Sequence, residues 1–147
     1  RPVSLMDIFS TVEAVTRGGA DPPPWPAEER ALDGANLLPY VRGAKTGDPH
    51  EALFWRSWYN SAVRRGPWKL IVQKAGSPGT DESDLLRLFN LESDPYEKTD
   101  LSGERPDVVR ELRALLEEWE SGLADPRWPP VMHFYIDVWG RRYWFAI

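Results

Sequence analysis

The stretch Ala62-Val63-Arg64-Arg65-Gly66-Pro67-Trp68-Lys69-Leu70-Ile71-Val72 decides the fold that this sequence predicts. Apolar and polar side chains alternate on both sides of the Gly66-Pro67 pair. Alternation with a period of two, broken by a glycine-proline pair, is typical of a β-hairpin. The hairpin is the centre of a longer pattern that extends over residues 50–91.

Two more segments of strand character flank this hairpin. One precedes it, with Asn60 as a short turn, and one follows it after a loop rich in Gly, Ser, Pro and Asp at 75–84. The predicted strands are residues 52–59, 61–65, 67–73 and 85–91. Strands at hairpin spacing pair with their neighbours in sequence, so the sequence predicts a four-stranded antiparallel meander.

The longest predicted helix covers residues 106–123 and begins at Pro106. Its apolar residues lie on a single face, which suits a helix lying across a sheet. They are Val108, Leu112, Leu115, Leu116, Trp119 and Leu123. A leucine zipper is less favoured, because the stripe lasts only about two heptads. We expect one face of the second hairpin strand (Trp68, Leu70, Val72) to pack on the helix through Leu112, Leu116 and Trp119.

A shorter amphipathic helix is predicted at residues 4–16. Ser4 is a candidate cap with Asp7 three residues on, and Gly18-Gly19 ends the helix. Its apolar stripe consists of Leu5, Ile8, Phe9, Val12 and Val15. No segment before it in this sequence is available to bury the stripe. This asymmetry indicates a partner domain that is missing from the chain.

Three connecting segments leave alternatives open. The proline-rich loop 20–33 predicts polyproline conformation, with Trp25 either packed on its own protein or acting as a ligand for a proline-binding domain. The acidic loop 91–101 does not match the spacing of a calcium loop, and turn chemistry at Asp94-Pro95 explains it without an ion. Residues 131–147 predict an aromatic hairpin turning at Trp139-Gly140, which we expect to dock on its own core, on the missing domain or on a second subunit.

Composition excludes some classes of function. A chain of 147 residues fits one domain, and a net charge of −5 argues against a nucleic-acid backbone as partner. No apolar run approaches 18 residues, so no membrane span is predicted. The chain has no cysteine, which excludes disulfides and thiolate metal sites. It begins Arg1-Pro2, which we interpret as a cut start, and the compartment stays unknown.

The residues alone do not supply a complete catalytic set. There is no glycine-rich phosphate loop, nucleophile elbow or metal-binding histidine pair. The candidate substrate-binding residues are His50, at the start of the first strand, and Arg56 and Arg64 on adjacent strands. An arginine fork suits sulfate, phosphate or carboxylate, although pairing with acids across the strands is the commoner role. For His50 the alternative is a partly exposed surface residue.

The order of five segments resembles the sulfatases, of the alkaline-phosphatase superfamily. Pro2–Val12 is similar to a helix found late in their catalytic domain, and the other segments continue the match in the same order. They are Asp33–Pro39, His50–Arg56, Ala62–Ile71 and Leu88–Leu101. The resemblance covers most of residues 1–120, and the final Trp-Phe-Ala-Ile is similar to a sulfatase tail with lower specificity.

The resemblance also implies what this chain lacks. Sulfatases carry a Cys/Ser-x-Pro-x-Arg segment whose Cys or Ser becomes formylglycine, together with Asp/Asn calcium ligands, all upstream of the matched part. In that family, hydrated formylglycine attacks sulfur beside a calcium ion. This sequence has no such segment. The resemblance therefore points to the C-terminal subdomain, which in that family docks on the α/β domain and closes one side of the substrate cleft.

We therefore expect an α+β fold: a four-stranded antiparallel sheet covered by the long helix, with the N-terminal helix and the terminal hairpin facing a missing α/β domain. Residues 1–43 are interpreted as the end of the catalytic domain and a linker, 44–125 as the sulfatase C-terminal subdomain, and 126–147 as the tail. The expected function is that of the C-terminal portion of a sulfatase. The resemblance implies calcium and formylglycine for the whole enzyme, and none is expected to be bound by this chain. The chain alone is predicted to be inactive. Partners would be the upstream catalytic domain, a sulfate ester and, through the tail, a second copy. The alternative is a stand-alone tryptophan-rich ligand-binding or oligomerisation module.

Overall fold

The structure is a computed structural model, and it describes residues 1–19, 32–125, 127–128 and 130–146. It divides into two compact units, Arg1–Glu51 and Ala52–Ile147, which are described separately below. Most of the proline-rich loop, with Trp25, lies outside the described residues. The expected domain boundaries at 43/44 and 125/126 stay predictions.

The first unit contains the predicted N-terminal helix, α1 (Met6–Thr16), and one short helix, α2 (Leu38–Val41). The backbone N–H of Ser4 donates to Asp7 Oδ2 at 2.7 Å, which is one half of a capping box. At the other end, Gly18 and Gly19 adopt positive φ, and the Gly19 N–H donates to the Ala14 carbonyl at 2.7 Å. The C-terminal end of α1 therefore forms as the sequence predicts. The helix itself begins at Met6 rather than at residue 4, and its N-cap is Leu5, without a side-chain cap hydrogen bond, rather than Ser4.

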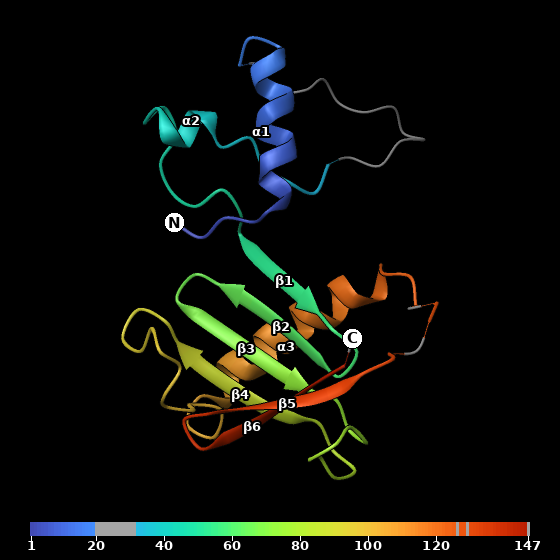
Figure 1. Cartoon of the computed structure of the whole chain (residues 1–147). Helices are drawn as coiled ribbons and strands as arrows, with labels where there is room; N and C mark the ends of the chain where they lie inside the picture. Colours follow the sequence, from blue (N-terminus) through green and yellow to red (C-terminus); the bar gives the residue numbers. More distant parts are fainter. Residues whose placement is uncertain (20–31, 126, 129, 147) are drawn as a thin grey trace. The chain divides into compact units, whose positions relative to one another are not determined.

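The second unit is built on the predicted meander. Its four strands are antiparallel and lie in the order β1-β2-β3-β4 (Figure 1). Their bounds are β1 Ala52–Arg56, β2 Asn60–Arg65, β3 Trp68–Gln73 and β4 Leu85–Asn90. Arg65 pairs with Trp68 across the two-residue turn, and Gly66 has a φ of 55°, as the first position of a primed hairpin turn requires.

The first strand is shorter than predicted. It ends at Arg56 rather than at residue 59, and residues 57–59 form the turn that the sequence placed at Asn60. The Ser57 N–H donates to the Asn60 carbonyl at 2.7 Å and closes this turn. The aromatic side chains of Trp58 and Tyr59 suggested strand, but the Tyr59 hydroxyl instead bonds His133 Nδ1 at 2.9 Å. A tertiary contact thus overrides their strand propensity.

Helix α3 (Pro106–Ser121) covers one face of the sheet, as predicted, and ends two residues early. The core between them is formed by buried aliphatic residues of the strands and the helix. They are Val63, Leu70, Val72, Leu88, Val108, Val109, Leu112 and Leu116. Trp119 stacks on Phe54 with ring centroids 5.0 Å apart. The expected packing of the β3 face on the helix stripe is confirmed.

A second hairpin lies over the other face of the sheet, so that this unit has three layers (Figure 1). It consists of β5 (His133–Val138) and β6 (Arg141–Ala146), joined by a turn in which Trp139 and Gly140 have φ of 52° and 73°. Positive φ at both central positions marks a type I′ turn. The Arg87 guanidinium lies 4.4 Å from the Tyr143 ring, so the hairpin contacts its own chain. That it also faces a missing domain stays a prediction.

Candidate functional site

The three candidate residues have three different surroundings. His50 belongs to the first unit, whereas Arg56 and Arg64 lie on opposite faces of the sheet, because Arg56 shares its face with Phe54 and Arg64 shares its face with Leu53. Arg56 and Arg64 nevertheless line one cavity, described below, and His50 is described with the first unit alone. Their role in substrate binding stays a prediction.

His50 is held by a buried carboxylate. Its Nε2 lies 2.7 Å from Asp7 Oδ1, and the Asp7 side chain has no exposed surface. The same carboxylate accepts hydrogen bonds from the backbone N–H groups of Ser4 and Ala35. Burial acts to raise the pKa of Asp7, but these hydrogen bonds and His50 together outweigh it and lower the pKa. Asp7 thereby fastens residue 35 and His50 to α1.

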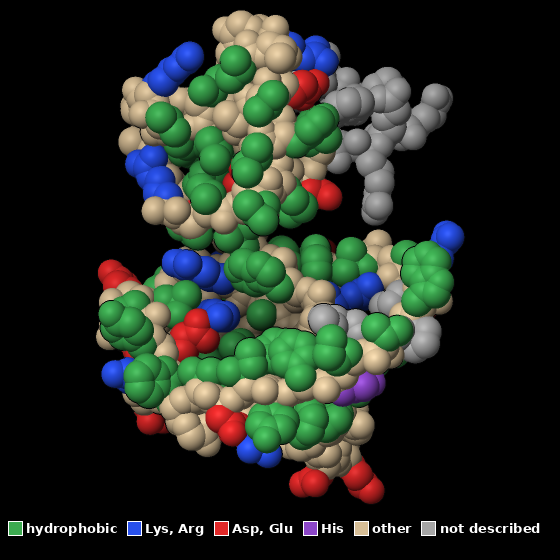
Figure 2. Space-filling view, viewed as in Figure 1, with side chains coloured by type: hydrophobic (Ala, Val, Ile, Leu, Met, Phe, Trp, Pro, Cys, Tyr) green, Lys and Arg blue, Asp and Glu red, His purple; other side chains and the backbone are tan. Residues whose placement is uncertain are grey.

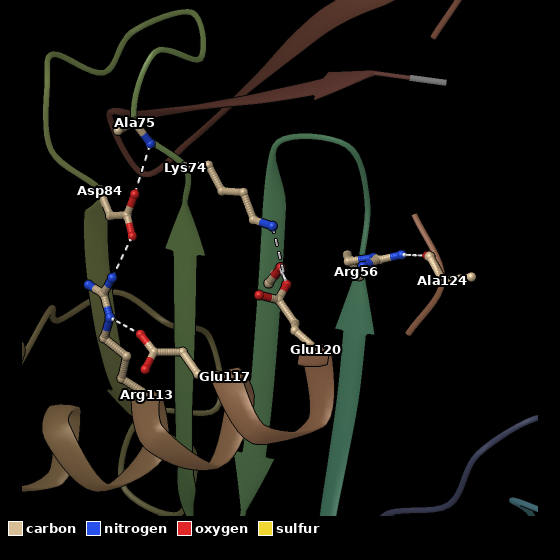
Figure 3. Close-up of polar contacts among 9 residues, drawn as sticks. Arg56, Lys74, Ala75, Asp84, Arg113, Glu117, Glu120 and Ala124 are labelled. Atoms are coloured by element: carbon tan, nitrogen blue, oxygen red, sulfur yellow. Dashed lines mark hydrogen bonds and ion pairs between the residues drawn. The ribbon is translucent and has the colours of Figure 1, made fainter. Parts of the chain in front are cut away.

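Arg56 anchors the end of the long helix (Figure 3). Its guanidinium donates to the Ala124 carbonyl at 2.7 Å, on the face of the sheet that α3 covers. Nearby, Glu120 accepts a hydrogen bond from the Ser61 hydroxyl and pairs with Lys74. These contacts tie the last turn of α3 and the residues after it to β1, to β2 and to the residue that follows β3. The structure thus gives Arg56 a packing role, although the residue also contributes to the cavity described next.

Arg64 faces a cavity on the other side of the sheet. The cavity has a volume of about 740 Å³ and lies between the sheet, the loop after β4 and strand β6. Its floor contains two rows of cross-strand neighbours, Arg64 with Lys69 and Trp55 with Ala62 and Ile71. The walls include Pro95, Glu97, Tyr143 and Phe145.

The cationic side chains of this cavity differ in whether an acid lies beside them. Lys69 Nζ lies 2.5 Å from Glu97 Oε1. Arg64 Nε makes only a long bond of 3.4 Å to the Gly66 carbonyl, and within the described part of the chain no acid pairs with it. Burial raises the pKa of Tyr143, with Arg87 and Arg141 acting in the opposite direction. Tyr143 is therefore a neutral phenol at pH 7. Of the three cationic side chains that line the cavity, Arg56, Arg64 and Lys69, only Lys69 is paired with an acid in the described part of the chain.

Sequence reasoning found Arg64 but missed its neighbours. Lys69 could have been placed beside Arg64, since a two-residue turn at Gly66-Pro67 fixes that register. The contribution of Tyr143 and Phe145 depends on how the second hairpin docks, about 80 residues further along the chain. No local signal in the sequence predicts that contact.

The cofactors that the resemblance implies do not fit the residues present. Among the described residues, no group of three or more His, Cys, Asp or Glu side chains is placed to hold a metal ion. The sequence also lacks the Cys/Ser-x-Pro-x-Arg segment that formylglycine formation needs. In the described part of the chain, no helix has both the length and the apolar character needed to cross a bilayer.

Comparison with known proteins finds sulfatases. Arylsulfatase J of Mus musculus is 28% identical over 120 residues, covering 65% of this chain and 20% of that protein. Human N-acetylgalactosamine-6-sulfatase is 29% identical over 82% of this chain and 27% of its own length. A comparison with models of protein families finds no match. The matched parts of Arylsulfatase J and N-acetylgalactosamine-6-sulfatase show that this chain spans about a quarter, or less, of the length of these relatives.

Solved structures show the same likeness. One, labelled BT33336S-sulf and from work on glycosaminoglycan metabolism by Bacteroides thetaiotaomicron, is 28% identical with a TM-score of 0.58. The match covers 78% of this chain and 24% of that one. The predicted resemblance to the C-terminal subdomain of sulfatases is confirmed, and the stand-alone module is not favoured.

Proposed function

We propose, from the similarity of this chain to the C-terminal subdomain of sulfatases, that it is the C-terminal part of an enzyme that hydrolyses sulfate esters. The observation that carries the proposal is the coverage: most of this chain matches sulfatases, and the match takes up 20% to 27% of their length. The nucleophile and the metal site would lie in the remaining length. This chain would supply support and binding residues.

The partner that we propose for α1 is the upstream catalytic domain. The apolar stripe of α1 is exposed in the structure, with Leu5 84% and Phe9 63% accessible (Figure 2). Its buried residues are instead Asp7, Ser10 and Ala14, which face the rest of the first unit. An amphipathic helix normally turns its apolar face inward, so an exposed apolar face of this kind marks a surface that binds another protein surface.

A second element of the proposal is that the chain closes one side of the substrate cleft. His50, Arg56 and Arg64 are the residues expected to reach substrate, and an arginine fork suits the sulfate group. Groups that hold remote parts of a substrate contribute binding energy rather than bond-breaking. Replacing one of them by Ala in the complete enzyme should therefore raise KM more than it lowers kcat.

The competing explanation for each residue is structural, and the kinetics separate the two. His50→Ala would release Asp7, and Arg56→Ala would release the Ala124 carbonyl, so a purely structural role predicts a lower melting temperature with unchanged KM. Arg64→Ala removes only one long hydrogen bond to the Gly66 carbonyl and should change KM without changing stability. If KM is unchanged in all three variants, the chain does not contact substrate through these residues.

The terminal hairpin is the proposed route to a homo-oligomer. Several apolar side chains of its strands and turn stay about half exposed although the hairpin packs on the sheet. They are Tyr135, Ile136, Val138 and Trp139. Figure 2 shows a band of hydrophobic side chains along this layer. Sedimentation velocity of the complete enzyme, with Ile136→Lys as the variant, tests whether this surface joins two copies.

A further inference from the structure

The charges of the cavity between the sheet and β6 are arranged to receive an anion. Arg64 and Lys69 lie directly opposite each other on neighbouring strands and point to the same face. Like charges in this position repel each other and destabilise a sheet. Glu97 compensates Lys69 alone, so the guanidinium of Arg64 keeps donors for a bidentate acceptor. Sulfate and carboxylate groups have that geometry.

The backbone of Glu97 gives an independent sign of a specialised site. Glu97 has a φ of 56°, and apart from Trp139 it is the only non-glycine residue in the described ranges with positive φ. A left-handed conformation at a bulky residue is uncommon, and such strain concentrates at ligand-binding positions. Here it directs the Glu97 carboxylate to Lys69 and leaves Arg64 unopposed.

Next to Arg64 and Lys69, the cavity has an apolar surface on which a ligand's ring can stack. Trp55, Ala62 and Ile71 are cross-strand neighbours, and the small side chain of Ala62 leaves a hollow between the two larger ones. Trp55 is 48% exposed in spite of its size. Tyr143 and Phe145 line the same cavity from β6. Flat apolar side chains of this kind bind the faces of sugar and aromatic rings.

The distance between Ala62 and Arg64 allows one ligand to contact both the apolar surface and the arginine. Residues 62 and 64 are two positions apart on β2, which places their side chains on one face and about 7 Å apart. That separation matches the reach of a sulfate or carboxylate carried on a six-membered ring, either directly or through one exocyclic carbon. The volume of about 740 Å³ lies within the usual range for small-molecule sites, and it is large enough for more than one ring.

We infer that this cavity binds an anionic ring compound, a sugar or aromatic ring that carries sulfate or carboxylate, with its ring on Trp55 and its anion on Arg64. The site lies entirely within residues 52–147 and does not require hydrolysis. The inference rests on the proposed function, which already assigns Arg64 to the sulfate group, and it adds the ring surface and the class of ligand. Binding by this chain is measured without sulfatase activity, so either proposal can fail without the other.

The test is a titration of the ¹⁵N-labelled 147-residue chain, followed by two-dimensional NMR. The probes are glucose 6-sulfate and phenyl sulfate, with glucose and inorganic sulfate as partial ligands. We expect one ring sulfate to shift the Trp55 indole signal and the amides of Ala62 and Tyr143, and to bind at least about tenfold more tightly than either partial ligand. Comparison of the two ring sulfates distinguishes a sugar from an aromatic ligand.

Three variants test which charged side chains contribute to binding of the ring sulfate. Arg64→Gln should weaken binding of the ring sulfate about ten- to a hundredfold, the usual effect of losing charge-assisted hydrogen bonds. Glu97→Gln frees Lys69 and should strengthen binding severalfold. The matched control is Arg110→Gln, which removes an exposed arginine from α3, on the opposite side of the sheet, and should change the affinity less than about twofold.

Three results would overturn the inference. One is the absence of any shift around the cavity with both ring sulfates. Another is binding of inorganic sulfate as tightly as the ring sulfates, which would show a general anion site only. The third is equal weakening by Arg64→Gln and Arg110→Gln. Should Arg64→Gln fail to fold, the map of shifts on the unaltered chain decides alone.

Discussion

Replacement of Trp119 by Ala tests how α3 is held on the sheet. The Trp119 ring stacks on Phe54 at 5.0 Å with an angle of 10° between the planes, and it packs against the core at the C-terminal half of the helix. Trp119 is half-buried. The substitution would therefore expose Phe54 and open a gap between β1 and α3.

The expected loss of stability follows from the buried area and the stack. Truncation to Ala removes roughly 100 Å² of buried apolar area, worth about 2.5 kcal/mol at 25 cal/mol per Å². The loss of an aromatic pair adds about 0.5–1.5 kcal/mol. Trp119→Ala should thus lower the free energy of unfolding by about 3–4 kcal/mol.

Urea unfolding of the 147-residue chain, followed by circular dichroism, measures this change. The matched control is Trp128→Ala, because Trp128 is 78% exposed and its loss should cost less than about 0.5 kcal/mol. If the two variants have the same stability, Trp119 does not join helix and sheet, and the packing described for α3 is wrong.

Other predictions concern the first unit. Asp7 has a lowered pKa in the folded chain, so its stabilising effect is present above the unfolded value of 3.8 and is lost as the pH falls through the folded value. The protection factors of the α1 amides against hydrogen exchange should therefore fall below about pH 4, and Asp7→Asn should remove this dependence. Gly34→Ala should expose the same amides at neutral pH, because a Cβ there would overlap the Met6 carbonyl. Phe9→Ser should leave the isolated chain as stable as before, and pull-down with the catalytic domain should show weaker binding.

Local patterns were sufficient to predict the sheet and the helices. The alternation around Gly66-Pro67 set both the strands and their register, since a one-residue shift would have turned Leu70 and Val72 away from the helix. The stripe of α3 is a local feature too, and it matched the apolar face of the sheet. The first strand was predicted too long because the contact between Tyr59 and His133 joins residues that are distant in sequence.

The candidate site was predictable only in part. Arg64 could be selected because arginine on a strand suits an anion, but its partners come from a loop and a hairpin whose docking is non-local. His50 was expected to be a cleft or surface residue, and the sequence offered no sign that Asp7, 43 positions earlier, would hold it. Contacts of this kind follow from tertiary packing rather than from spacing along the chain.

The most direct test of the central claim is aryl-sulfate turnover by purified residues 1–147, with calcium present, alone and together with a sulfatase catalytic domain encoded upstream. We predict no turnover by the chain alone, because sulfate-ester cleavage needs an activated nucleophile and concentrated positive charge at the sulfuryl oxygens. Turnover should appear when the catalytic domain is supplied. Metal-dependent turnover by residues 1–147 alone would contradict the account.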